Sequence, residues 1–169
     1  ARLDRTLDVT LGPDAEALLV EAVVFGRTAM GETVTRGRFR DRWRVRRDGV
    51  LVFADGTSMD GDLGSVMARP LALGEGCAFA TLLWVSPRAE RQVDELREAM
   101  GIVRDDPLAP VDESVHPPIR DDVRLGVSAW DGLLSVRVAA RDGAGLRWAL
   151  ERVLQPLRQG RPLPTVWRC

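Results

Sequence analysis

The sequence predicts a protein dominated by β-structure, with about seven mostly antiparallel strands and two helices. Three observations carry this prediction. Residues 36–47 alternate arginines with other side chains at a period of two, Asp-Gly pairs at 48–49 and 131–132 indicate tight turns, and only two segments place apolar residues at helical spacing. With 169 residues, 45% of them hydrophobic, residues 1–169 are expected to form a single domain with its own core.

The first two predicted strands lie within the first 25 residues of the chain. Residues 5–11 alternate and lead into a Gly-Pro-Asp turn, and residues 15–25 form a branched, apolar stretch that stops at Gly26. The chain opens directly in strand-like sequence, so we expect further residues to precede it in the full protein.

The third predicted strand carries arginine at every even position. Phe39, Trp43 and Val45 occupy odd positions, so one face is cationic and the other apolar. An Asp-Gly turn at 48–49 then makes a hairpin with the segment that follows. A slip of one residue would bury the arginines, so we expect the apolar face to point to the core. Asp41, the charge on that apolar face, should lie near the strand's edge or pair with a neighbouring arginine. The even positions are Arg36, Arg38, Arg40, Arg42, Arg44 and Arg46.

The arginine-rich side of this strand allows three interpretations. It can be a solvated sheet surface, a protein-docking surface or a nucleic-acid surface. Arginine is enriched at protein interfaces, which supports the second interpretation. A net charge of −1 argues against a general attraction to nucleic acid. The candidate docking residues are Arg36, Arg38, Arg40, Arg42 and Arg44.

Turn residues and then a long apolar run predict turns followed by a central strand in the middle of the chain. Residues 57–64 are rich in Ser, Asp and Gly and indicate turns, whereas residues 77–86 form a continuous apolar run typical of a central strand. Ser86 as N-cap and Pro87 as first residue should begin a helix that Gly101 ends.

A second hairpin and a second helix follow a long polar segment. The acidic, proline-rich residues 104–122 are expected to form a surface loop. Residues 123–140 should form a hairpin around the second Asp-Gly turn. Asp142 is the expected cap of the last helix, which Pro156 must kink or end.

Three residues could carry nucleophilic or metal chemistry: Cys77, Cys169 and His116. They are not at metal-ligand spacing, and no glycine-rich phosphate loop follows a strand. We therefore expect no catalytic site and no tight metal site, and an enzyme that uses Cys77 or His116 stays an alternative. Two cysteines make no disulfide framework, and no apolar run approaches the roughly 20 residues that span a bilayer. The expected location is the reducing cytoplasm.

The segment EAVVFGRTAMGE, residues 21–32, is the most unusual local pattern. Gly26 and Gly31 interrupt strand-like sequence, with Arg27 beside them and the carboxylates Glu21 and Glu32 at the two ends. Glycines within a strand often indicate a bulge or a close backbone approach. The segment is either a bulged strand with a structural ion pair between Arg27 and one of the glutamates, or a polar cluster that lines an interior or an interface.

This segment resembles the motif E-x4-G-R-x-A-x-G-E of the urease accessory protein D family, called H in some ureases. The later stretches WDGLLSVRV, GLRWALERVLQPLRQGRP and TVWRC follow the order of that family's hairpin, closing helix and tail. The resemblance runs along nearly the whole chain but concerns only the C-terminal part of the family, because the HPPGG-type and TKFYR-type segments of the N-terminal half are missing. The matching motif residues are Glu21, Gly26, Arg27, Ala29, Gly31 and Glu32.

The resemblance implies two stacked, twisted β-sheets and a non-enzymatic role as a scaffold in urease maturation. Family members bind the urease apoprotein and accessory protein F, which brings in the GTPase, accessory protein G. They assist nickel insertion without holding nickel as a tight cofactor, and a polar passage through the D protein has been proposed as the route. By resemblance, the motif residues would line that passage or an interface. The alternative is a β-rich protein- or nucleic-acid-binding module that uses residues 36–47.

Overall fold

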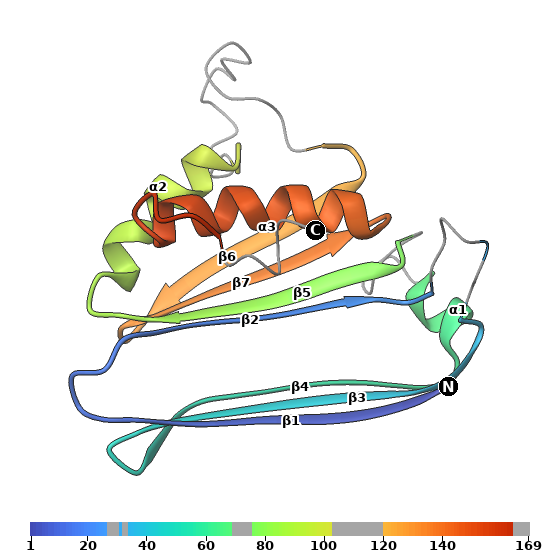
Figure 1. Ribbon diagram of the computed structural model, residues 1–169, viewed down its shortest axis with the longest axis horizontal. Coiled ribbons are helices and arrows are strands. Elements are labelled where there is room, and N and C mark those ends of the chain that lie inside the picture. The colour runs from blue at the N-terminus through green and yellow to red at the C-terminus, as the bar shows by residue number, and fades with distance from the viewer. Residues whose placement is uncertain (27–30, 32–33, 69–75, 103–119, 164–169) are drawn as a thin grey trace, which may run out of the picture.

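The computed structural model describes residues 1–26, 31, 34–68, 76–102 and 120–163, and it contains two stacked β-sheets (Figure 1). The elements are β1 (Arg2–Leu11), β2 (Ala17–Val24), β3 (Arg36–Arg47), β4 (Val50–Asp62), α1 (Leu63–Met67), β5 (Ala78–Val85), α2 (Ala89–Ala99), β6 (Val123–Trp130), β7 (Leu133–Ala140) and α3 (Gly143–Leu157). The three-stranded sheet has the order β1-β3-β4, and the four-stranded sheet has the order β2-β5-β7-β6. All neighbouring strands are antiparallel except β1 and β3. The predicted β-rich fold of two stacked, mostly antiparallel sheets is confirmed.

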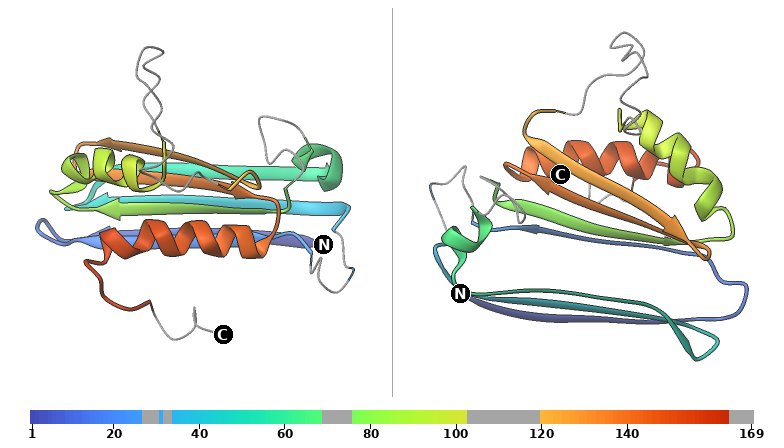
Figure 2. Two further views of the ribbon diagram at one scale, coloured as in Figure 1. Left: turned by 90° about the horizontal axis from the view of Figure 1, so that it is seen from above. Right: turned by 180° about the vertical axis from the view of Figure 1, so that it is seen from behind.

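The outer face of the four-stranded sheet is covered by α2 and α3 (Figures 1 and 2). Strand β5 lies between β2 and β7, and every one of its residues is buried, as its continuous apolar sequence predicts. Leu96 of α2 and Leu150 and Val153 of α3 pack onto this face of the sheet. Each side chain of this size contributes roughly 1.5–3 kcal/mol when fully buried, so the helix layer stabilises the four-stranded sheet.

The inner faces of the two sheets pack against each other through apolar side chains. Phe39, Trp43 and Val45 are 1%, 2% and 0% exposed on the inner face of β3, as the period of two predicts. The Phe39 ring meets the Phe79 ring of β5 edge to face, with 5.6 Å between the ring centres. Trp43 packs in a second cluster with Leu83 of β5. The predicted register of the arginine strand is therefore confirmed.

Both predicted Asp-Gly turns are present. The φ angles are 48° and 78° at Asp48 and Gly49, and 46° and 73° at Asp131 and Gly132. Positive φ at both central residues is the hairpin turn that matches the right-handed twist of the flanking strands. The Gly132 N–H also donates a hydrogen bond of 2.7 Å to Oε1 of Glu90, which ties the second hairpin to the start of α2.

The prediction of turns over residues 57–64 is wrong, because β4 continues to Asp62 and α1 follows it. Met59 lies opposite Phe39 in the ladder and is buried, so pairing with β3 outweighs the local preference of Gly and Asp for turns. The Asp62 carboxylate accepts a hydrogen bond of 3.1 Å from the Ser65 N–H and caps α1. This helix adds to the two that the sequence predicts.

Helix α2 begins later than the sequence predicts, at Ala89 rather than Pro87. The Ser86 hydroxyl accepts a hydrogen bond of 3.2 Å from the Arg88 N–H, so it stabilises the turn before the helix instead of capping the helix itself. The predicted end is confirmed, since Gly101 follows the last turn with a φ of 67°, in the left-handed region that favours glycine.

Helix α3 agrees with its predicted limits. Oδ1 of Asp142 accepts a hydrogen bond of 2.9 Å from the Gly145 N–H, which confirms the cap. The helix ends at Leu157, one residue after Pro156, and Gln159 and Gly160 follow with φ angles of 53° and 73°, the left-handed conformation that commonly ends a helix. Among the helices of the described residues, none is long and apolar enough to cross a membrane.

Candidate functional site

A row of polar side chains crosses the space between the two sheets. In the three-stranded sheet, the register places Arg5 beside Asp41 and Asp41 beside Thr57. In the four-stranded sheet, Glu21 lies beside Thr81, and an arginine of β7 follows across the sheet. The period of two points these side chains toward the opposite sheet. We call the set the polar layer: Arg5, Asp41 and Thr57 from one sheet, and Glu21, Thr81 and Arg137 from the other.

Arg5 links the two sheets at one end of the polar layer. Its Nη2 lies 2.6 Å from Oε2 of Glu21 in the opposite sheet and 3.1 Å from Oδ2 of Asp41 on the neighbouring strand. The same Asp41 oxygen accepts a hydrogen bond of 3.3 Å from Nε1 of Trp43. The guanidinium also stands over the Phe39 ring, 5.4 Å from its centre. Two carboxylates share one cation here, so this end of the layer carries net negative charge.

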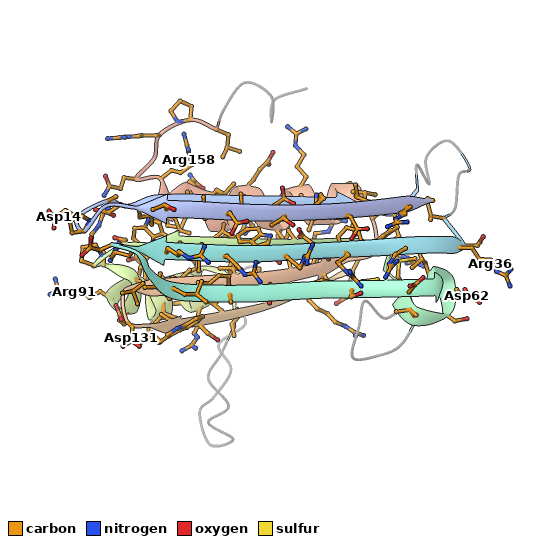
Figure 3. The ribbon with its side chains drawn as sticks, turned by 90° about the horizontal axis from the view of Figure 1, so that it is seen from below. Asp14, Arg36, Asp62, Arg91, Asp131 and Arg158 are labelled. Carbon is orange, nitrogen blue, oxygen red and sulfur yellow. The ribbon has the colours of Figure 1, made fainter. Side chains whose placement is uncertain are left out.

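A second ion pair links the sheets at the other end of the polar layer. Nη2 of Arg137 lies 2.5 Å from Oδ2 of Asp55, which is two residues before Thr57 on β4 and so points the same way. Thr57, Arg137 and Gly126 of β6 line a cavity of about 510 Å³ at this edge. In Figure 3, the four-stranded sheet extends beyond β4 at the edge where this cavity lies.

The polar layer reaches the surface at both edges of the sandwich. The cavity opens it on the side of β4 and β6. On the side of β1 and β2, the side chains of Arg5 and Glu21 are 25% and 31% exposed. Between these edges the side chain of Asp41 is only 7% exposed, and Thr81 is buried. The layer is therefore a row of polar side chains across an otherwise apolar interior.

This layer contains buried polar atoms that are costly for the stability of the sandwich. Nε of Arg5 and Oδ1 of Asp41 are buried without a hydrogen-bond partner in the described part of the chain, at a cost of about 1–3 kcal/mol each. The layer also divides the inner core into one apolar cluster around Phe39 and another around Trp43. A well-packed apolar core is often more stable than a buried ion cluster of the same volume. Stability alone therefore does not account for these residues.

The predicted glycine-arginine motif is described in part. Glu21 belongs to the polar layer, whereas Arg27 and Glu32 lie outside the described residues, so their predicted ion pair stays a prediction. Gly26 and Gly31 have φ angles of 86° and 74°, in the region that favours glycine. At Gly31 no atom of the described residues lies within 4 Å of the place that a Cβ would take, and its positive φ is the observed reason for glycine here.

Arg5 is a site residue that sequence reasoning missed. A signal was present, because the inner positions of β1 place Arg5 between Leu3 and Leu7, so a charge interrupts an apolar face. Asp41 interrupts the apolar face of β3 in the same way. Opposite charges on two apolar faces indicate a buried pair. The expectation that Asp41 pairs with an arginine is confirmed, and the arginine comes from the parallel neighbour β1.

The predicted docking arginines of β3 lie on the outer side of the three-stranded sheet. Arg36, Arg42 and Arg44 are exposed, and Arg38 and Arg40 are half-buried. The structure therefore separates the two predicted sets of site residues, since Glu21 lies between the sheets and the arginines lie on an outer surface.

Cys77 is half-buried at the start of β5, and its Sγ donates a hydrogen bond of 3.2 Å to the carbonyl oxygen of Arg141. Burial, and then the nearby carboxylate of Asp142, raises the pKa of the thiol. The other two candidates, His116 and Cys169, lie outside the described residues. Within the described ranges, no three His, Cys, Asp or Glu side chains are grouped so as to hold a metal ion.

We expect Cys77 to react slowly with iodoacetamide. In a Cys169→Ser variant, where Cys77 is the only thiol, the labelling rate at pH 8 should be several-fold lower than that of a free cysteine, because the thiolate is the nucleophile. The rate should still be rising at about pH 9, where an unperturbed thiol is largely ionised. Timed mass spectrometry measures this rate. Fast labelling that levels off below pH 8 would show an activated thiol and favour the enzyme alternative.

The fold and the polar layer define a class of protein: a two-sheet β-sandwich with charged side chains between its sheets. Comparison with known proteins then identifies the family. The sequence profile described as UreD urease accessory protein matches residues 1–168. The chain belongs to the UreD urease accessory protein family.

Three relatives illustrate the extent of the similarity. The chain is 44% identical over 165 residues to the urease accessory protein UreD of Rhizobium leguminosarum bv. trifolii, covering 98% of this chain and 53% of the relative. It is 43% identical over 168 residues to that of a Methylobacterium species, covering 99% and 55%. It is 40% identical over 167 residues to that of Agrobacterium fabrum, covering 99% and 51%. The chain spans about half the length of the curated relatives it matches.

Proposed function

We propose that this chain acts in urease maturation, as a non-enzymatic cytoplasmic scaffold that assists nickel insertion into the urease apoprotein. The observation that carries the proposal is membership of the UreD family over residues 1–168. The relatives are named urease accessory proteins, and in this proposal the chain acts by docking to the proteins that it assists. In this proposal the partners are the urease apoprotein and the accessory proteins F and G.

The polar layer supports the finer proposal that nickel passes between the two sheets. Polar side chains are accessible at both edges, and in this proposal an ion enters on one side and leaves on the other. Glu21 and Asp41 of the layer and the adjacent Asp55 offer carboxylate oxygens, which divalent cations accept as ligands. Nickel is the cargo of this route and not a resident cofactor.

The arginines of the polar layer keep nickel binding weak. Arg5 already contacts Glu21 and Asp41, and Arg137 already contacts Asp55. An incoming Ni²⁺ ion has to compete with these guanidinium groups for the carboxylates, and like charges repel it. Oxygen ligands also hold Ni²⁺ less tightly than imidazole does. A transported ion must leave as well as enter, so weak binding at several sites is the property that passage requires.

Glu21→Gln should slow nickel-dependent urease activation by about tenfold, the range typical of losing a group that positions a metal. The substitution keeps the size of the side chain and removes the charge nearest the β1 and β2 edge. The measurement is the initial rate of urea hydrolysis after nickel is added to cells or extracts that contain the variant and the urease proteins. The matched control is Glu95→Gln on the exposed side of α2, which should activate urease normally.

Two results would contradict separate parts of the proposal. Normal activation by both Glu21→Gln and Asp41→Asn, with each variant folded by circular dichroism, would exclude the polar layer as the nickel route and leave the scaffold role intact. A wild-type chain that binds none of the urease apoprotein, accessory protein F and accessory protein G would contradict the scaffold role itself.

A further inference from the structure

The outer face of the three-stranded sheet is an open surface lined by arginines. Helices α2 and α3 cover the other sheet, and no helix in the described part of the chain packs on this outer side (Figures 1 and 3). We call the outer row on β3 the arginine face: Arg36, Arg38, Arg40, Arg42, Arg44 and Arg46.

Three arginines of the arginine face form ion pairs with aspartates of the neighbouring strands. These pairs are long and their side chains are partly exposed to water, so they hold the arginines only weakly. They offset part of the positive charge on either side of Arg42 and Arg44. The pairs are Arg38–Asp60 at 3.5 Å, Arg40–Asp4 at 3.9 Å and Arg46–Asp8 at 3.6 Å.

Arg42 and Arg44 differ from these three, because neither forms an ion pair with another described residue. Arg42 lies in register between Thr6 and Gly56, and Arg44 lies between Asp8 and Ala54. The Asp8 carboxylate forms its ion pair diagonally with Arg46 and not with Arg44. Arg42 and Arg44 are both exposed, and their Cα atoms are two residues apart on an extended strand, roughly 7 Å. The arginine face therefore carries two adjacent arginines without an ion pair to the described residues.

We infer that the arginine face docks a partner protein whose carboxylates meet Arg42 and Arg44. Arginine forms paired, parallel hydrogen bonds with a carboxylate and is enriched at protein interfaces. The two arginines without an ion pair favour an acidic surface by charge complementarity, and the weakly paired arginines on either side can exchange their aspartates for groups of the partner. The inference rests on the proposed function, which supplies the candidates: the urease apoprotein and accessory proteins F and G.

The charge pattern around the arginine face favours a protein over a nucleic acid. Aspartates of β1 and β4 run along both sides of the arginine row, at Asp4, Asp8 and Asp60. A phosphate backbone laid along the row would face these carboxylates. The whole chain has a net charge of −1, so it lacks the general attraction that dominates nucleic-acid affinity.

The test compares two double variants of the 169-residue chain. Arg42→Gln/Arg44→Gln removes the two arginines without an ion pair, and Arg38→Gln/Arg46→Gln removes the same number of charges from the same face at positions with ion pairs. Both variants should melt at the wild-type temperature, since these side chains are solvent-exposed in part and make only weak pairs. Biolayer interferometry then measures binding to the urease apoprotein, accessory protein F and accessory protein G, one at a time, and to poly-L-glutamate and a short duplex DNA.

The expected result is that Arg42→Gln/Arg44→Gln weakens binding to one urease protein by about tenfold or more, while Arg38→Gln/Arg46→Gln loses little affinity. Equal losses in the two variants would overturn the inference, because diffuse charge would then explain the binding. Full binding by both variants would also overturn it and leave the proposed function standing.

A wild-type chain that binds none of the three urease proteins would contradict the proposed function, and the two model polyanions would then decide the inference. Binding to poly-L-glutamate that needs Arg42 and Arg44 would support an acidic protein partner. Tighter binding to duplex DNA, falling steeply with salt, would overturn it in favour of nucleic acid.

Discussion

Trp43→Ala should lower the free energy of unfolding by about 3–5 kcal/mol, the range for deleting a large aromatic side chain from a core. Trp43 is 2% exposed and packs between the sheets with Val45, Phe53 and Leu83. Alanine would leave a cavity that strands of two sheets, held by their ladders, cannot close. The substitution also removes the N–H that donates to Asp41, so a buried carboxylate loses a partner. Urea unfolding followed by far-ultraviolet circular dichroism measures the change.

Trp130→Ala is the matched control for this prediction. Trp130 contacts the same Phe53 ring, with 6.3 Å between ring centres, but it is 39% exposed at the end of β6. Its loss should therefore destabilise the protein by less than half as much as the loss of Trp43. Equal effects of the two substitutions, or a change below about 1 kcal/mol for Trp43→Ala, would show that the core between the sheets is not packed as described.

Arg5→Met should lower the free energy of unfolding by about 3 kcal/mol, the lower end of the range for breaking a buried ion pair. Methionine keeps the apolar length of the side chain but leaves Asp41 and Glu21 beside each other without their shared cation. The effect stays at the lower end because Arg5 and Glu21 keep some contact with water, which screens the charges. Chemical unfolding at constant pH and salt measures the loss.

Two further variants separate the charge effect of Arg5 from a packing effect. Arg2→Met removes an exposed arginine from the same strand, 72% exposed and paired with Asp4, and should change stability by about 0–1 kcal/mol. The triple variant Arg5→Met/Glu21→Leu/Asp41→Leu removes all three charges and should recover most of the loss, since an apolar cluster replaces a buried ionic one. An Arg5→Met variant as stable as Arg2→Met would contradict the buried cluster.

Elements whose signal is local were predictable from the sequence. The period of two placed Trp43 inside and the arginines outside, because side-chain direction along a strand depends only on position parity. The Asp-Gly pairs fixed both hairpins through the backbone freedom of their own residues. The second half of β4 was not predictable in this way, because Gly56, Asp60 and Gly61 favour turns, and only the ladder to β3 holds them extended.

The polar layer was predictable only in part, because its members come from strands that are distant in sequence. Arg5 and Asp41 are 36 positions apart, and Glu21 belongs to the opposite sheet. The motif singled out Glu21, and the strand pattern singled out Asp41 as a charge on an apolar face. Which strands pair, and which sheet faces which, depends on tertiary packing, so the contact with Arg5 and the place of Arg137 could not be read from local patterns.

The parallel pairing of β1 with β3 has a consequence for how the chain folds. The chain passes from β1 in one sheet to β2 in the other and returns for β3, so the pairing of β1 with β3 closes a loop that contains β2. Closing this loop costs chain entropy, and proteins dominated by such non-local pairings fold in milliseconds to seconds rather than microseconds. Because β2 of one sheet lies in sequence between β1 and β3 of the other, we expect the two sheets to unfold together as one cooperative unit.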